Sequence, residues 1–282
     1  MQVKTWNLSS IVRIPTAAGD VWCKSVPPFF AHEGKIIAMV AADDPALVAP
    51  LLAADHPTAT VLLGDVPGDD QWDAPVERLV DMVRRLVRLQ SRWAGRTEEL
   101  LAAGLWDFRA AGFAALVDDL LRRAETRERL HAAELDAVDA LAARVPDLLE
   151  ELLTCGLPET LVHGDFHPGN WRYGPDGLVL LDWGDSAVGH PMLDFTAFLP
   201  RVPDGARPVV LAAWLDAWRG ERPEADPERA AELIAPLAAL RQALIYRAFL
   251  DAIEPGEHTY HEDDPAVWLR AAIEAEVPAT SG

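Results

Sequence analysis

The sequence predicts an α+β protein with a small β-rich N-terminal lobe and a larger, mainly helical C-terminal lobe. Residues 1–64 contain short runs of β-branched and aromatic residues separated by turn formers, whereas residues 65–282 contain long stretches with helical apolar spacing. Turn-forming residues at 64–68 separate these two regions. A chain of 282 residues, half of them hydrophobic, is also long enough to bury a sizeable core. We therefore place the boundary between the lobes after residue 64.

The N-terminal lobe is expected to begin with a strand at Gln2–Trp6 and a hairpin. Residues 10–15 and 21–26 are both strand-like, and the segment between them, Thr-Ala-Ala-Gly-Asp, favours a turn. The other elements expected in this lobe are a helix at residues 28–40 and strands at residues 47–54 and 58–63.

The C-terminal lobe is expected to consist of helices interrupted once by strands. Val76–Trp93 has apolar residues close to the 3.6-residue period of an amphipathic helix. Two short strands are expected around residues 161–184. The remaining helices are expected at residues 108–124, 129–153, 190–199, 209–219, 227–250 and 265–275.

The stretch that interrupts these helices carries the clearest chemical signal in the chain. Residues 161–184 have the sequence LVHGDFHPGNWRYGPDGLVLLDWG, with Asp165, then Asn170 five positions later, then Asp182 after an apolar run. Phosphoryl transfer needs one carboxylate to orient the attacking hydroxyl. It also needs oxygen ligands, such as a second carboxylate and a carboxamide, to hold magnesium. This order of residues therefore indicates ATP-dependent phosphoryl transfer.

Composition and charge narrow the classes of partner. The formal net charge of −20 disfavours nucleic acid and suits cationic ligands. Cys23 and Cys155 lie far apart and have no metal-type spacing, which is typical of buried thiols in a reducing compartment. The sequence has no basic segment followed by an apolar run at its start and no uncharged run of 18 apolar residues. We expect a cytoplasmic protein that does not act in a membrane and needs no obligate protein partner.

These residues resemble the aminoglycoside phosphotransferase family, whose fold is that of the eukaryotic protein kinases. The resemblance covers most of the chain and is densest at residues 161–195. It implies a bilobal protein-kinase-like fold and transfer of a γ-phosphoryl group from ATP or GTP to a substrate hydroxyl. By this resemblance, Asp165 is the catalytic carboxylate, Asn170 and Asp182 bind Mg²⁺, and His163 and Asp194 support the catalytic loop.

The resemblance also implies residues that bind the nucleotide. Lys24 matches the lysine of the third strand, and Glu33 falls where a helix glutamate pairs with that lysine. One departure is that residues 6–10, Trp-Asn-Leu-Ser-Ser, stand where kinases have a glycine-rich loop over the phosphates. We expect Ser9 and Ser10 to take its place. The adenine edge is expected to meet the backbone of Gly64, Asp65 and Val66.

The acceptor substrate is expected to be a small cation. Residues 253–264 are rich in Asp and Glu, and such a cluster beside a pocket attracts ammonium or guanidinium groups. Asp185, Asp263 and Asp264 are the candidate substrate residues, and the resemblance favours an aminoglycoside or a basic peptide antibiotic. A metabolite kinase acting on choline, a sugar, homoserine or a fructosamine is the alternative.

The same residues exclude or disfavour three other classes of protein. A protein kinase is excluded because only six residues separate Gly184 from Pro191, too few for an activation loop. A nucleotide-binding protein without transfer activity is disfavoured by the intact Asp, Asn and Asp set. A zinc or iron hydrolase is disfavoured because it would leave Asn170 without a role. The metal ligands of such a hydrolase would come from His163, His167, His190, Asp165 and Asp182.

Overall fold

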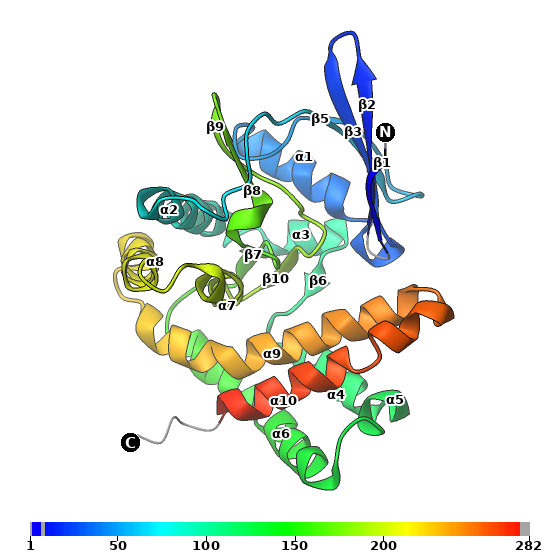
Figure 1. The fold of residues 1–282 in the computed structure, drawn as a ribbon. Helices are drawn as coiled ribbons and strands as arrows, with labels where there is room; N and C mark the ends of the chain where they lie inside the picture. The colour runs from blue at the N-terminus through cyan, green and yellow to red at the C-terminus, as the bar shows by residue number, and fades with distance from the viewer. Residues whose placement is uncertain (1, 7–8, 277–282) are drawn as a thin grey trace.

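The computed structural model describes residues 2–6 and 9–276, and it has the predicted α+β architecture with a sheet-rich N-terminal part and a helical remainder (Figure 1). The N-terminal part is a five-stranded antiparallel sheet in the order β1-β2-β3-β5-β4. Its elements are β1 Gln2–Trp6, β2 Ser9–Thr16, β3 Gly19–Ser25, α1 Glu33–Asp43, β4 Leu51–Asp55 and β5 Thr60–Gly64.

Two elements of this part begin later than the sequence predicts. Prolines 27 and 28 hold a short 3₁₀ turn at Pro28–Phe30, so α1 begins at Glu33 instead of residue 28. Residues 47–49 are buried but do not join the sheet, because Pro50 interrupts the strand and Val48 instead bridges to Leu180. The N-terminal sheet is thereby joined to the strands of the catalytic region.

The helical part surrounds two small groups of strands. One sheet has the order β6-β10-β7, and β8 and β9 form a hairpin. The strands are β6 Trp106–Asp107, β7 Thr160–Val162, β8 Trp171–Gly174, β9 Gly177–Leu180 and β10 Ala187–Gly189. The helices are α2 Val76–Trp93, α3 Thr97–Ala103, α4 Ala110–Arg122, α5 Ala124–Arg127, α6 Ala132–Thr154, α7 Met192–Phe198, α8 Arg207–Glu221, α9 Pro227–Ala252 and α10 Asp264–Glu276. Short 3₁₀ turns lie at Pro168–Asn170, Leu199–Arg201 and Pro255–Tyr260.

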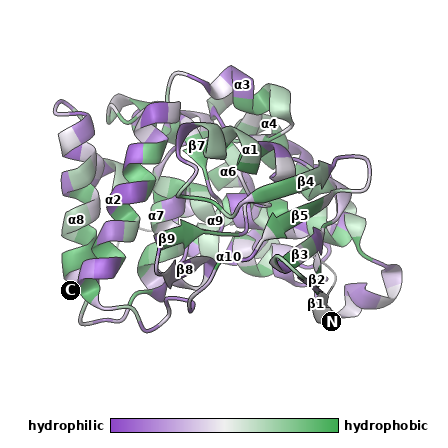
Figure 2. Cartoon of the chain, turned by 90° about the horizontal axis from the view of Figure 1, so that it is seen from above, coloured by the Kyte–Doolittle hydropathy of each residue, from purple (hydrophilic) through white to green (hydrophobic). Residues whose placement is uncertain are grey.

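Most buried apolar residues of both parts belong to one cluster, and a second, smaller cluster at the end of α9 contains Phe249, Leu250 and Ile253. Residues of α1 such as Ile36 and Val40 belong to the same cluster as residues of α2 such as Leu79 and Met82. α2 shows polar and apolar residues along its length, whereas β4 and β5 are mainly apolar (Figure 2). This shared core fixes the sheet-rich part against the helices, and the candidate site lies where the two meet.

Helix α9 is central to the helical part. It runs across the molecule with α10 packed alongside it (Figure 1). α9 is long and apolar enough to cross a membrane, but 72% of its most apolar window is buried inside the protein. We interpret it as a core helix, because a buried helix satisfies the same test of length and hydropathy.

Candidate active site

The catalytic stretch forms a loop between β7 and the turn Pro168–Asn170. Its first glycine, Gly164, has a backbone φ of +88° and lies against the backbone of Asp185. A Cβ atom at this position would collide with the Asp185 carbonyl oxygen. The glycine therefore allows the loop to approach the segment after Asp182, which brings Asp165 close to that segment.

Asp194 of α7 holds this loop from behind. Its Oδ2 atom accepts hydrogen bonds from the backbone N–H of His163 at 2.9 Å and from Nε2 of Gln90 at 2.9 Å. Its Oδ1 atom accepts the backbone N–H of Gly164 at 2.8 Å. The carboxylate is fully buried. Such a buried carboxylate with three donors fixes the backbone that carries Asp165.

His163 links the loop to the neighbouring segment. Its Nε2 atom lies 3.0 Å from the carbonyl oxygen of Leu181. Because a carbonyl only accepts hydrogen bonds, Nε2 carries the proton. Burial lowers the pKa of His163 to about 4, so the ring is neutral at physiological pH. His163 therefore acts as a fixed hydrogen-bond donor next to Asp182.

Two side chains orient the carboxylate of Asp165. The Nδ2 atom of Asn170 donates to the Asp165 carbonyl oxygen at 2.9 Å and to Oδ2 at 3.1 Å. The Nε2 atom of His167 lies 3.3 Å from the same Oδ2 atom, while Nδ1 of His167 accepts the backbone N–H of Gly169 at 3.0 Å. Because Nδ1 accepts a hydrogen bond, Nε2 carries a proton and donates to Asp165.

These contacts set the charge of Asp165. Burial alone would raise its pKa, but the hydrogen bond and charge of His167 hold it well below its ordinary value. The carboxylate is thus ionised at physiological pH. Both side-chain contacts engage Oδ2. Within the part of the chain that the structure describes, no group donates a hydrogen bond to Oδ1 of Asp165. This oxygen is therefore open to a substrate group.

Lys24 lies between two carboxylates at the interface of the two parts. Its Nζ atom is 2.6 Å from Oε1 of Glu33 and 2.6 Å from Oδ1 of Asp182. Burial alone would lower the pKa of Lys24, but the negative charges of Asp182 and Glu33 raise it above its ordinary value. Lys24 therefore stays charged, and it joins β3, α1 and the segment after β9 in one contact.

Asp182 differs from its neighbours in backbone and exposure. Its φ is +63°, in the left-handed region that few residues other than glycine adopt. The loss of water around its carboxylate would raise the pKa of Asp182, but the nearby charge of Lys24 lowers this pKa, so the side chain is ionised. The side chain is 48% exposed within the crevice. Its second oxygen is therefore accessible to a ligand.

The oxygen donors of Asp182 and Asn170 fit a magnesium ion. The amide nitrogen of Asn170 is engaged by Asp165, so its oxygen is directed away from that contact. One carboxylate oxygen and one carboxamide oxygen match the hard ligands that Mg²⁺ prefers. Among residues 2–6 and 9–276, no group of three or more His, Cys, Asp and Glu side chains is placed to share a metal ion. The five candidate ligands of a zinc or iron hydrolase therefore do not form a shared metal site.

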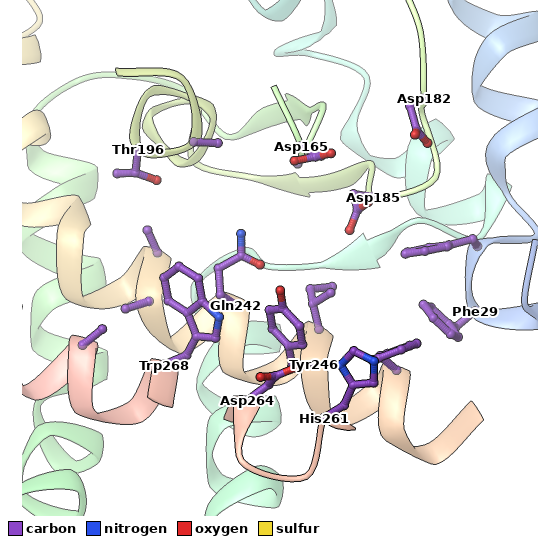
Figure 3. Close-up of a pocket in the computed structure, with 18 of the residues that line it drawn as sticks. Phe29, Asp165, Asp182, Asp185, Thr196, Gln242, Tyr246, His261, Asp264 and Trp268 are labelled. Atoms are coloured by element: carbon purple, nitrogen blue, oxygen red, sulfur yellow. Dashed lines mark hydrogen bonds and ion pairs between the residues drawn. The ribbon is translucent and has the colours of Figure 1, made fainter. Parts of the chain in front are cut away.

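A cavity of about 530 Å³ opens beside these residues. It is lined by six of the predicted residues, and Figure 3 labels Asp165, Asp182, Asp185 and Asp264 among them. The predicted residues that line the cavity are Ser9, Lys24, Asp165, Asp182, Asp185 and Asp264. The cavity thus brings together the start of β2, the loop that carries Asp165 and the start of α10.

Other predicted residues lie elsewhere. Asp263 does not line the cavity; its side chain is 71% exposed and lies 3.2 Å from Arg129. Asp65 accepts a hydrogen bond from Nε1 of Trp22 at 2.7 Å, and residues 64–66 are outside the cavity lining. Ser10 pairs with Ser25 in the sheet. Residues 7 and 8 of the expected phosphate loop lie outside the described residues.

Sequence reasoning missed Arg241 of α9. Its Nη1 atom donates to the carbonyl oxygen of Gly164 at 2.9 Å, and its Nη2 atom donates to that of Asp185 at 3.0 Å. Only 3% of Arg241 is exposed. A lone arginine within the apolar run LAALRQALIY was the available signal, because a charge in a core helix needs buried partners. Gln90 of α2, which donates to Asp194, carried no comparable signal.

This two-part fold pairs Lys24 with Glu33 and places Lys24 against Asp182, with Asp165 and Asn170 in the adjoining loop. Such an arrangement defines the class of kinase-like phosphotransferases. The chain belongs to the phosphotransferase enzyme family (APH), whose family model matches residues 2–233. It is therefore a small-molecule phosphotransferase, and members of this class use a nucleotide and a divalent metal ion. None of the curated protein sequences matches this chain.

Solved structures share the fold at low sequence identity. A macrolide 2'-phosphotransferase, MphH from Brachybacterium faecium, is 19% identical with a TM-score of 0.60, covering 98% of this chain and 91% of its own. A putative aminoglycoside phosphotransferase from Ralstonia eutropha is 16% identical with a TM-score of 0.63, covering 98% and 91%. The choline kinase LicA from Streptococcus pneumoniae is 14% identical with a TM-score of 0.63, covering 97% and 90%. At these identities the likeness concerns the fold.

Proposed function

We propose that this chain transfers the γ-phosphoryl group of ATP or GTP to a hydroxyl group of a small cationic molecule, with Mg²⁺. The observation that carries the proposal is the ionised Asp165 carboxylate in the same cavity as Lys24 and Asp182. Phosphoryl transfer depends mainly on positioning and on neutralising charge, and these residues supply both.

Asp165 is proposed as the catalytic carboxylate. Its Oδ1 atom would accept a hydrogen bond from the acceptor hydroxyl and later its proton, while Asn170 and His167 hold Oδ2. His163 and Asp194 would keep the loop in place. A loose transition state requires little deprotonation in advance, so a low pKa at Asp165 is compatible with this role.

Asn170 and Asp182 are proposed as the magnesium ligands. The bound ion would supply charge neutralisation at the phosphate oxygens. Lys24, held by Glu33, would contact the α- and β-phosphates as a fixed positive charge. The geometry in support is the position of Lys24 Nζ, 2.6 Å from both Glu33 and Asp182.

The remaining nucleotide contacts are proposals from the resemblance. Ser9 lines the cavity, which supports a role near the phosphates, and Ser10 follows it in β2. The backbone of Gly64, Asp65 and Val66 would meet the adenine edge. This assignment makes residues 1–64 the nucleotide-binding lobe and residues 65–282 the catalytic and substrate-binding lobe, with β5 ending at Gly64.

Two acceptor classes are retained: an aminoglycoside or other basic antibiotic, and a metabolite such as choline. Asp185 and Asp264 line the cavity and support a cationic acceptor, whereas Asp263 contributes at most a long-range charge. A cytoplasmic location is also proposed, because nucleoside triphosphates are available there and Cys23 and Cys155 are both free.

Mass spectrometry would test the proposed reaction. The protein is incubated with Mg²⁺, ATP or GTP and a panel of basic antibiotics, choline and amino sugars, with the Asp165→Ala variant alongside. We expect a phosphoryl mass gain on a panel member with the native protein and none with the variant. Equal product with Asp165→Ala would remove this residue from the catalytic role. Absence of transfer from all members despite measured nucleotide binding would contradict the proposed acceptor class.

A further inference from the structure

The inner wall of the cavity, away from Lys24, is aromatic and apolar. Tyr246 of α9 stacks on Trp268 of α10, with ring centroids 6.4 Å apart and an angle of 20° between planes. Phe249 meets His261 edge to face with centroids 4.7 Å apart. The small residues of the same wall come from α9 and α10 and are Ala235, Ala238, Ala239, Ala271 and Ala275. This wall suits an apolar body of substrate rather than a chain of charged groups.

Few carboxylates accompany this wall. Besides Asp165 and Asp182, the acidic residues that line the cavity are Asp185 and Asp264. Other acidic residues of the segment 253–264 are engaged outside it: Glu262 lies 2.7 Å from Arg129, and Asp263 pairs with the same arginine. The acidic segment as a whole therefore does not face the substrate. Its contribution inside the cavity is a single carboxylate.

The available carboxylates converge on one aromatic ring. Burial raises the pKa of Tyr246, and the negative charges of Asp264, Asp165 and Asp185 raise it further. Figure 3 shows the ring of Tyr246 standing between Asp264 and Asp185, beside the indole of Trp268. Oδ2 of Asp264 is held 3.0 Å from Nδ1 of His261. A cation at this ring would meet negative charge and an aromatic face together.

A positive charge in the cavity disfavours a second cation. Arg201 also lines it, and its Nη1 atom donates to the carbonyl oxygen of Ala197 at 2.7 Å. The guanidinium is close enough to influence the charge of Asp165. Apart from Asp165 and Asp182, an additional ammonium group would find only Asp185 as a carboxylate among the residues that line the cavity, and it would also face the positive charge of Arg201. Burying a poorly paired charge is costly.

We propose that the acceptor is an alcohol with one ammonium group on an apolar body, and that Asp264 with the rings of Tyr246 and Trp268 forms its cation subsite. The inference rests on the proposed function and narrows it, because it disfavours the polycationic aminoglycosides. Gln242 of α9 points into the same space and supplies an amide for a polar group of the substrate (Figure 3).

Binding measurements test this subsite without requiring turnover. The probes are 4-(dimethylaminomethyl)benzyl alcohol, its uncharged counterpart 4-isobutylbenzyl alcohol, and the polycation kanamycin. Each is titrated calorimetrically into the full chain loaded with Mg²⁺ and a non-hydrolysable ATP analogue. We expect the amino alcohol to bind at least about tenfold more tightly than the uncharged alcohol, equivalent to about 1.4 kcal/mol. We also expect it to bind more tightly than kanamycin.

Matched variants identify the residues responsible. Asp264→Asn should remove most of the preference for the charged alcohol, because the amide keeps the contact to His261 without the charge. Asp263→Asn is the control and should keep the preference, since Asp263 lies outside the cavity. Tyr246→Phe should retain binding of the amino alcohol and Tyr246→Leu should weaken it. Circular dichroism of each variant verifies that it is folded.

Any one of the following binding results would overturn the inference. They are tighter binding of kanamycin than of the amino alcohol, equal binding of the charged and uncharged alcohols, and equal effects of Asp264→Asn and Asp263→Asn. Failure of all three probes to bind would also overturn it. Failure of the proposed function would appear separately, as loss of nucleotide binding or as absence of phosphoryl transfer from every acceptor in the mass-spectrometric panel.

Discussion

Replacing Arg241 with Met should destabilise the fold and slow the reaction, because this buried arginine joins α9 to the catalytic loop. The substitution removes the donors to the carbonyl oxygens of Gly164 and Asp185, at 2.9 and 3.0 Å. Methionine has a similar length and fills part of the space, so the loss is chiefly that of the hydrogen bonds. Both carbonyl groups would be left without these charged donors.

The magnitude follows from the two orphaned carbonyls. A buried acceptor left without a donor costs about 1–3 kcal/mol, which gives roughly 2–6 kcal/mol for the pair. Removing a guanidinium that is only 3% exposed relieves part of its own desolvation cost. We expect a net loss of about 3 kcal/mol and, at about 2 °C per kcal/mol for a chain of this size, a fall in Tm of about 6 °C.

The catalytic effect should appear mainly in kcat. Arg241 contacts the carbonyl oxygen of Gly164, directly before Asp165, and that of Asp185, three residues after Asp182, so its loss lets these two segments shift relative to each other. A displacement of about 1 Å at a reacting group can cost about 100-fold in rate, and we expect a fall of about 10- to 100-fold. Thermal unfolding followed by circular dichroism and a coupled ADP-release assay measure the two effects.

The matched control is Arg229→Met on the same helix. Arg229 is 46% exposed and pairs with Glu151 and Glu232 at the surface, so its loss should change Tm far less than the loss of Arg241 and leave kcat unchanged. If Arg241→Met and Arg229→Met changed Tm and kcat equally, the assignment of Arg241 as a positioning residue would be refuted.

Three other predictions concern the charged groups of the cavity. Asp182→Asn should weaken the binding of nucleotide in the presence of Mg²⁺ at least about tenfold, measured by calorimetry with and without the metal ion; an unchanged metal dependence would contradict the ligand assignment. Burial raises the pKa of Asp185 to about 7, so its ionised form is gained as pH rises through about 7, and a cationic acceptor should bind more tightly at pH 8 than at pH 6. Asp185→Asn should flatten this pH profile of calorimetric Kd, and an identical profile in the variant would remove Asp185 as its source. Glu33→Gln should raise the KM for the nucleotide by removing one of the two carboxylates that hold Lys24, whereas Asp43→Asn at the surface end of α1 should leave this KM unchanged in the same assay.

The contact between Asp165 and Asn170 could be predicted because the two residues are close in sequence. Asp165 and Asn170 are five residues apart and hydrogen-bond directly. The strong periodicity of α2 likewise predicts the observed bounds, Val76–Trp93. In contrast, α3 has only seven residues, too few for periodicity to indicate a helix.

The supporting contacts were harder to predict because they join distant parts of the chain. Gln90 reaches Asp194 across 104 positions, and Arg241 reaches Gly164 across 77. Spacing along the sequence carries no information about such pairs.

The difference between Asp263 and Asp264 has a similar origin. The two residues are adjacent and chemically equivalent, and only the direction in which α10 begins places one in the cavity and the other beside Arg129. The orientation of a helix start depends on tertiary packing, here of α10 on α9. The sequence could therefore indicate an acidic substrate region but not which carboxylate faces the substrate.

The most direct test of the central claim is single-turnover phosphoryl transfer by the native chain and by Asp165→Asn, with nucleotide affinity measured on the same samples. The account predicts equal affinity for the Mg²⁺–nucleotide complex in both proteins. It predicts a fall of about 10²- to 10⁴-fold in the rate of transfer to the acceptor identified by mass spectrometry, as expected for loss of a positioned base. Transfer at the native rate by Asp165→Asn would contradict the account.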